Sequence, residues 1–181
     1  MAFLELVSKR QSVRDYLEKP VEREKIERCL EAARLAPSAC NSQPWKFIVV
    51  DDPNLKEAVA RETFSSVISF NRFTLKAPAI IIIVSENRKL LPQIGGAIKD
   101  KPYHLIDVGI AAEHICLQAV EEGLGTCMVG WFNESPLKKL LGIPERKRIE
   151  LLITIGYPSA EAIRKKNRIE LPGIYSYNKY E

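Results

Sequence analysis

Three short polar segments of the chain have residue types that could bind a flat, phosphate-bearing ligand. In the first, Arg10, Ser12 and Arg14 alternate along the sequence, just after the first expected helix. An extended backbone would point all three side chains to one side. Two guanidinium groups and a hydroxyl on one side suit a phosphate and the polar edge of a ring. The alternative is a solvated loop with surface ion pairs, because exposed charge is common.

The second and third segments combine amide side chains with glycines. Residues 36–45 read Ala-Pro-Ser-Ala-Cys-Asn-Ser-Gln-Pro-Trp, and their Asn and Gln amides both donate and accept hydrogen bonds, which suits a ring with an alternating donor and acceptor edge. The same residue types also favour an ordinary turn. Residues 123–132 hold Gly123, Gly125 and Gly130, which would let the backbone approach a flat ligand. The alternative there is a helix stop followed by a glycine-weakened strand.

Several common catalytic and metal-binding motifs are missing from the sequence. It holds no G-x-G-x-x-G after a strand, no P-loop, no G-x-S-x-G and no H-E-x-x-H. The cysteines at 29, 40, 116 and 127 form no C-x-x-C pair, and His104 and His114 are too far apart along one helix to make a good metal pair. We therefore expect no metal site and no catalytic side chain, so an enzyme of this sequence would take its reactive atom from a cofactor.

Hydrophobic periodicity predicts the elements that must position these segments. Helices are expected over about 2–9, 21–36, 52–62, 103–122 and from Ser135 onward, and strands over 46–50, 79–84, 126–130 and 149–155. The 79–84 run is short and rich in β-branched residues, which indicates a central strand covered on both faces. The 103–122 helix is apolar nearly all round, which favours burial in a core or between subunits. The order of elements predicts a sheet packed by helices, in an α+β or α/β arrangement.

Length, charge and apolar runs narrow the class of protein further. A chain of 181 residues suits one domain, and its net charge of +4 is too small to indicate nucleic-acid binding by itself. A nucleic-acid arm built from the basic run 164–168 and the late tyrosines is the weaker alternative. The longest apolar run, 79–84, is far shorter than the roughly 20 residues that span a bilayer. The N-terminus has no signal-peptide pattern, so we expect a cytoplasmic protein without membrane or nucleic-acid partners.

Taken in order, the polar segments resemble the nitroreductase family of flavin enzymes. The match consists of Arg-x-Ser-x-Arg at 10–14, Pro-Ser-Ala-Cys-Asn-Ser-Gln-Pro-Trp at 37–45, Asp-x-Gly-x-Ala at 107–111, Gly-Leu-Gly-Thr-Cys at 123–127 and Ile-Gly-Tyr-Pro at 155–158. It covers nearly the whole chain. The resemblance implies an α+β fold with a central, mostly antiparallel sheet packed by helices. It also implies a single domain over 1–181 in an intertwined homodimer, with 159–181 as a C-terminal extension that wraps the partner subunit.

The resemblance further implies an FMN site at the subunit interface. Arg10, Ser12 and the late pair Lys166 and Arg168 would hold the phosphate, and Arg14 would face the pyrimidine edge of the flavin. Backbone at 128–130 would lie near N5, and part of the 37–43 segment would reach the flavin held mainly by the other subunit. The full set of residues expected to bind the cofactor is Arg10, Gln11, Ser12, Arg14, Pro37, Ser38, Ala39, Asn41, Gln43, Asn71, Met128, Val129, Gly130, Lys166 and Arg168.

The activity that the resemblance implies is FMN-dependent oxidoreduction with NAD(P)H as the electron donor. NAD(P)H would reduce N5 and leave, and an electron-poor small molecule such as a nitroaromatic or a quinone would then take its place, which gives ping-pong kinetics. Two alternatives stay open: an FMN-binding electron relay without turnover, and a specialised branch that dehalogenates iodotyrosines or fragments the flavin. The 86–103 segment is short where longer members carry a lid or extra helices, which leaves two expectations: an open substrate channel, or specificity that lies in the C-terminal tail.

Overall fold

A single antiparallel sheet forms the centre of the molecule. The computed structural model describes residues 2–86, 101–160 and 162–180. The sheet has the strand order β1-β2-β4-β3, with β1 at Trp45–Val50, β2 at Ala79–Ser85, β4 at Ile149–Gly156 and β3 at Gly125–Val129. All three strand pairs are antiparallel. The predicted strands are therefore confirmed, and so is the α+β class.

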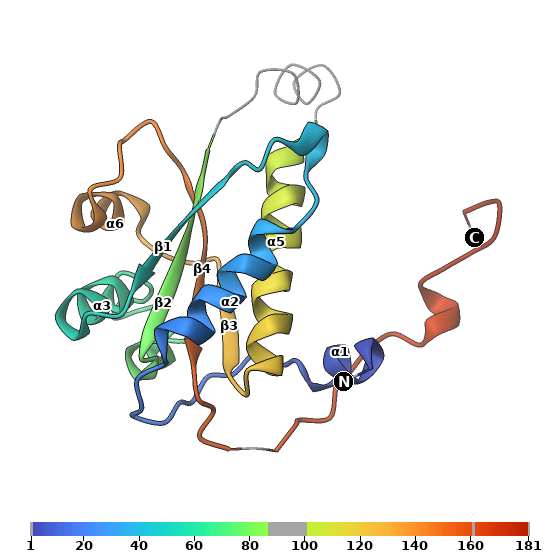
Figure 1. Cartoon of the computed structure of the whole chain (residues 1–181), viewed down its shortest axis with the longest axis horizontal. Coiled ribbons are helices and arrows are strands. Elements are labelled where there is room, and N and C mark those ends of the chain that lie inside the picture. Colours follow the sequence, from blue (N-terminus) through green and yellow to red (C-terminus); the bar gives the residue numbers. More distant parts are fainter. Residues whose placement is uncertain (1, 87–100, 161, 181) are drawn as a thin grey trace.

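Helices cover both faces of this sheet (Figure 1). One face carries α2 (Arg23–Arg34) and α5 (Tyr103–Glu121), and the other carries α3 (Pro53–Arg61) and α6 (Glu134–Leu141). A short N-terminal helix, α1 (Phe3–Lys9), contacts α5. Among the residues that the structure describes, the remaining elements are three 3₁₀ segments: η1 (Ala39–Asn41), η2 (Arg72–Lys76) and η3 (Leu171–Gly173). Within the described ranges, no helix combines the length and apolar character needed to cross a membrane.

Strand β2 shows why its sequence is apolar without a break. Successive side chains of a strand point to opposite faces of the sheet. Ile81 and Ile83 pack in one core with α2 and α5, whereas Ile80 and Ile82 pack in a second core with α3 and α6. All four isoleucines are fully buried. The prediction of a central strand covered on both faces is therefore confirmed.

The long helix α5 has one face in the core and another at the surface. Its buried face is made mostly of small residues, including Ala111, Ala112 and Cys116. Other apolar residues of the same helix are exposed within this chain, with Leu105 at 45% and Ile106 at 55%. Its C-terminus is closed by hydrogen bonds from Gly123 N to Val120 O and from Leu124 N to Ala119 O. This helix ending uses the positive φ of Gly123, which turns the chain directly into β3.

Gly156, the last residue of β4, lies where no larger side chain fits. A Cβ added there would lie 2.5 Å from Cδ of Pro78 and 2.9 Å from Cδ1 of Tyr16. Gly156→Ala should therefore lower the free energy of unfolding by about 1–3 kcal/mol, the usual effect of overpacking a core. Urea unfolding of the FMN-free protein measures this change. Gly130→Ala serves as control because nothing lies within 4 Å of its added Cβ, so an equal loss in both variants would contradict the steric argument.

Candidate functional site

The segment after α1 runs as an extended strand beside the sheet edge. Arg10 ends α1 with backbone angles near the extended region, at φ −59° and ψ 127°. Ser12 then forms a parallel bridge with Thr126 of β3, and Val13 N donates to Thr126 O at 2.8 Å. Arg10, Ser12 and Arg14 all line one pocket, and so does Gln11 between them. The structure therefore brings the three residues to one pocket, whereas their same-side arrangement stays a prediction.

The other wall of this pocket comes from the C-terminal part of the chain. Gln11 links the two walls, because its Oε1 accepts from Arg164 N at 3.1 Å and from Arg164 Nε at 3.2 Å. Gln11 Nε2 in turn donates to Ala162 O at 3.1 Å, and the Arg164 guanidinium also donates to Ser12 O. Together the walls enclose about 310 Å³, which we call the cationic pocket; it is lined by Arg10, Gln11, Ser12, Arg14, Arg164, Lys165, Lys166, Asn167 and Arg168.

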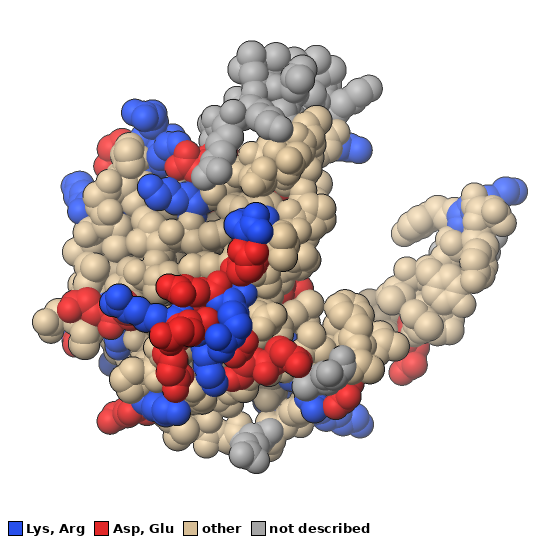
Figure 2. Space-filling view, viewed as in Figure 1, with Lys and Arg blue, Asp and Glu red and all other residues tan. Residues whose placement is uncertain are grey.

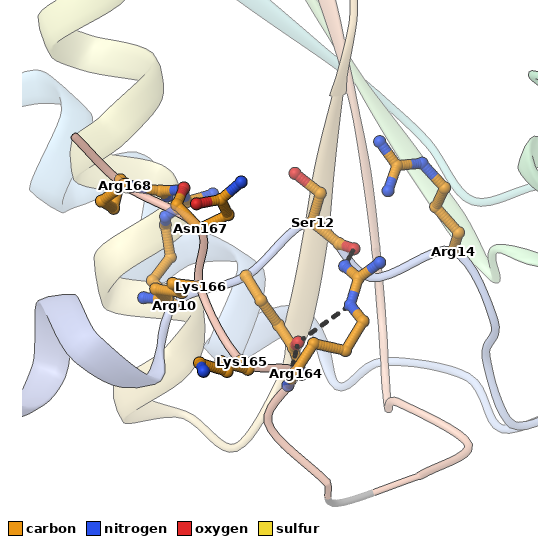
Figure 3. Close-up of a pocket in the computed structure, with 9 residues that line it drawn as sticks. Arg10, Ser12, Arg14, Arg164, Lys165, Lys166, Asn167 and Arg168 are labelled. Atoms are coloured by element: carbon orange, nitrogen blue, oxygen red, sulfur yellow. Dashed lines mark hydrogen bonds between the residues drawn. The ribbon is translucent and has the colours of Figure 1, made fainter.

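Positive charge dominates the cationic pocket. Six of its nine lining residues are Arg or Lys, and the remaining three are uncharged. Partial burial, together with the neighbouring charges of Arg10 and Arg168, lowers the pKa of Lys166. Glu113 of α5 offsets part of this charge, since its Oε1 lies 3.3 Å from Arg10 Nε. In the view of Figure 3, Arg10, Lys166 and Arg168 gather on one side of Ser12, whereas Arg14 lies on the other side. Such a site favours a doubly charged anion such as a phosphate monoester.

Strand β3 leads from this pocket to the second group of predicted residues. The carbonyl of Thr126 points away from β4 to accept from Val13 N. Because backbone groups alternate in direction along an antiparallel strand, those of Met128 face the same edge of β3, which ends at Val129. Gly130 is exposed just beyond the strand, whereas Val129 packs into the core. Met128, Val129 and Gly130 do not line the cationic pocket, and their contact with a ligand stays a prediction.

The buried side chain of Asn71 reaches the end of the same strand. Its Nδ2 donates to Trp131 O at 3.2 Å and to Thr63 O at 3.1 Å. This places Asn71 beside the chain that follows Gly130, outside the cationic pocket. Trp131 itself is 54% exposed and borders this edge.

Within one chain, the 37–43 segment lies apart from the cationic pocket. It contacts the N-terminal half of α5, where Ala39 N donates to Asp107 Oδ1 at 3.0 Å. Arg10 instead pairs with Glu113, almost two helical turns further along α5. Nine of the fifteen predicted residues therefore lie outside the pocket: Asn71, Met128, Val129 and Gly130, and in this segment Pro37, Ser38, Ala39, Asn41 and Gln43. The assignment of this segment to the flavin of another subunit stays a prediction.

Three pocket residues were missed by the sequence analysis. Arg164, Lys165 and Asn167 belong to the same basic run as Lys166 and Arg168, and that run is the signal that could have found them. Their placement depends on a contact with residues about 150 positions away, so periodicity alone does not predict it. The expected open channel at 86–103 falls largely on residues 87–100, which lie outside the described ones.

The cysteines and histidines take no part in the pocket wall. None of the four cysteines forms a disulfide, and burial raises the pKa of Cys116 to about 11, so its thiol stays protonated at neutral pH. His114 pairs through Nδ1 with the carbonyl of Ala32, and His104 lies 3.9 Å from Glu150. In the part of the chain that the structure describes, no group of three or more His, Cys, Asp and Glu side chains could hold a metal ion.

Comparison with known proteins gives a consistent family. The model of the nitroreductase family matches residues 7–157. A protein of Archaeoglobus fulgidus, whose name pairs NADH dehydrogenase with NAD(P)H nitroreductase, is 32% identical over 87% of this chain and 86% of its own length. The iodotyrosine deiodinase of Thermotoga neapolitana is 28% identical over 85% of this chain and 87% of its own length.

A solved structure agrees with this assignment at the level of the fold. The FMN-dependent nitroreductase of Clostridium difficile R20291 superimposes with a TM-score of 0.79 at 27% identity, over 98% of this chain and all of that one. The overall fold is thus shared with a protein that is named as an FMN-dependent nitroreductase. Because the family model spans most of the sequence and the Archaeoglobus relative aligns over most of both chains, the chain belongs to the nitroreductase family of oxidoreductase enzymes.

Proposed function

We propose that this protein is an FMN-dependent oxidoreductase that takes a hydride from NAD(P)H and reduces an electron-poor acceptor such as a nitroaromatic or a quinone. The observation that carries the proposal is the cationic pocket, where two distant parts of the chain place six Arg and Lys residues around one space. The FMN-dependent relative and the NAD(P)H nitroreductase relative support the cofactor and the donor. FMN, when bound, supplies two-electron chemistry at N5 of its ring.

The residues of the pocket fit the phosphate end of FMN. Arg10, Lys166 and Arg168 offer charged N–H donors, and Ser12 adds a hydroxyl between them and Arg14. Hydrogen bonds from cationic donors to a phosphate are stronger than those between neutral groups. Gln11 has a different role in the site, because both ends of its amide hold the C-terminal wall in place.

The ring end of the cofactor would lie along the free edge of β3. In Figure 3, Arg14 lies on the side of Ser12 that is opposite to the phosphate-binding group, and its Cζ is 5.7 Å from the centre of the Phe73 ring. Its fixed positive charge would stabilise negative charge on the pyrimidine part of a reduced flavin. The backbone N–H groups of Met128 and Gly130 would orient the ring without a side chain that titrates. We therefore assign binding and orientation to the protein and no proton transfer to a side chain.

We further propose that two copies of the chain form the functional unit. The arm beyond Arg168 projects from the body, and mostly uncharged residues form its surface (Figure 2). Leu171 is 66% exposed and Tyr177 is 80% exposed, and α1 exposes Phe3 and Leu4 in the same way. Exposed apolar surface of this extent marks an interaction site. A homodimer would cover it and would bring the 37–43 segment to the other copy's flavin.

The test of this function starts with the colour of the purified protein after FMN is added. We expect a flavin absorption band that survives gel filtration and that bleaches without oxygen when NADH or NADPH is added. Bleaching separates an oxidoreductase from a protein that only binds FMN. Steady-state turnover with a nitroaromatic or a quinone should give parallel double-reciprocal lines. A colourless protein would refute the proposal, and intersecting lines would refute the ping-pong scheme.

Reductive deiodination is the second candidate, because the Thermotoga relative is an iodotyrosine deiodinase. In that reaction two electrons from the reduced flavin and one proton would replace iodine on the ring of iodotyrosine by hydrogen and release iodide. Dithionite-reduced holoprotein should be mixed separately with iodotyrosine and with a nitroaromatic. Iodide release together with flavin reoxidation would favour this branch, whereas reoxidation by the nitroaromatic alone would favour the first.

A further inference from the structure

Asp107 is a buried residue of α5, and both of its carboxylate oxygens accept hydrogen bonds from one loop. The residue is only 4% exposed. Its Oδ1 accepts from Ala39 N at 3.0 Å, and its Oδ2 accepts from Ser42 Oγ at 3.4 Å. Both donors lie in the same loop, three positions apart. A buried carboxylate needs such donors, since an unpaired one would be costly.

Three residues of the loop that is bonded to Asp107 have positive backbone φ angles. Cys40 and Asn41 both have φ of 51°, and Gln43 has φ of 47°. These angles lie in the left-handed region, which residues other than glycine and asparagine rarely occupy, so Cys40 and Gln43 are the unusual ones. A second brace comes from Ser38, whose Oγ accepts from Gln43 N at 2.9 Å. The hydrogen bonds to the Asp107 carboxylate and to Ser38 Oγ therefore stabilise a loop conformation that local backbone preference disfavours.

The strained loop presents two amide side chains together. Gln43 Nε2 donates to Asn41 Oδ1 at 3.0 Å, so the two side chains are held as a pair. These are the two amides assigned by resemblance to the flavin of the other subunit. Their direction depends on the left-handed backbone of their own residues, which in turn depends on the loop's attachment to α5.

We propose that Asp107 is a positioning residue, which fixes the 38–43 loop so that Asn41 and Gln43 meet the flavin held by the partner subunit. This inference rests on the proposed function. Asp107 itself does not touch the cofactor. It acts through the two hydrogen bonds to Ala39 and Ser42, and a neutral residue of the same shape can replace it. An asparagine would accept from Ala39 N with its amide oxygen and donate to Ser42 Oγ with its amide nitrogen.

The experiment compares D107A with D107N in the FMN-loaded protein. We expect D107A to raise the Kd for FMN about tenfold and to shift the visible flavin band, because the loop loses both hydrogen bonds to a charged group. D107N should stay within about threefold of wild type, because its amide restores both contacts. The matched control on the same helix is Q118A, whose side chain bonds Glu122 at 3.0 Å and should leave both readouts unchanged.

Cys40 provides a local reporter that does not depend on activity. It is exposed in the loop, whereas Cys29, Cys116 and Cys127 are buried. Its alkylation should be several-fold faster in D107A than in wild type and in D107N. Wild-type values for both the FMN Kd and the Cys40 alkylation rate in D107A would overturn this inference alone. Failure of the wild-type protein to bind FMN would overturn the proposed function, and this inference with it.

Discussion

Replacing Arg10 and Lys166 together by alanine should weaken FMN binding by about a hundredfold or more. Each residue offers a charged donor to the cationic pocket from a different wall. A hydrogen bond to a charged group contributes about 1.5–3 kcal/mol, and tenfold in affinity corresponds to about 1.4 kcal/mol. Because pairs of ions are screened by salt, the wild-type affinity for FMN should also fall with ionic strength more steeply than that of the double variant.

Riboflavin gives the decisive control for this prediction, since it has the same ring but no phosphate. Its affinity, measured by flavin fluorescence quenching, should be nearly equal in the wild type and in R10A/K166A. The variant R61A serves as a protein control, because Arg61 pairs with Glu57 on the exposed side of α3. An equal loss of riboflavin and FMN binding would show that the two residues do not hold the phosphate.

Removal of the chain after Arg168 should convert the protein from a pair of chains to single chains. This truncation keeps both walls of the cationic pocket but deletes η3 and its exposed apolar neighbours, including Ile174 and Tyr177. Without the arm, each chain lacks the apolar surface that would contact the second copy. Sedimentation should therefore report a mass near the 20.5 kDa of one chain, less the deleted residues, in place of twice that value.

A second truncation, after Ala160, distinguishes the role of the arm from the role of the pocket wall. It also removes the basic run 164–168, so it should lose FMN binding as well as pairing. The chain that ends at Arg168 should instead retain measurable binding of the phosphate end of FMN. A dimer mass for the chain that ends at Arg168 would contradict the role given to the arm.

The sequence predicts the elements better than it predicts the contacts between them. The alternating burial of β2 and the glycine ending of α5 follow from periodicity and backbone preference, and both are observed. The extended backbone expected at residues 10–14 is also found, where Ser12 forms a bridge with Thr126 and Arg10, Ser12 and Arg14 line one pocket. These features depend on neighbours in the sequence, which is why they can be read from it.

Features that depend on distant residues escape such reasoning. The left-handed backbone at Cys40 and Gln43 runs against the intrinsic preference of those residues, so a local prediction would reject it. The Asp-x-Gly-x-Ala motif marks Asp107, but its burial and its partners become visible only when the loop and α5 lie together. In the same way, the Arg164 contacts to Gln11 and Ser12 join residues at opposite ends of the chain.

Residues 164–168 line the cationic pocket, and the apolar arm begins directly after them. Occupancy of that pocket and association of two copies are therefore thermodynamically linked if the arm binds a second copy. Linkage is reciprocal: the factor by which bound FMN raises the association constant of the subunits equals the factor by which association raises the affinity for FMN. Dilution should then release cofactor and subunits together, and saturating FMN should shift the midpoint of dissociation to lower protein concentration.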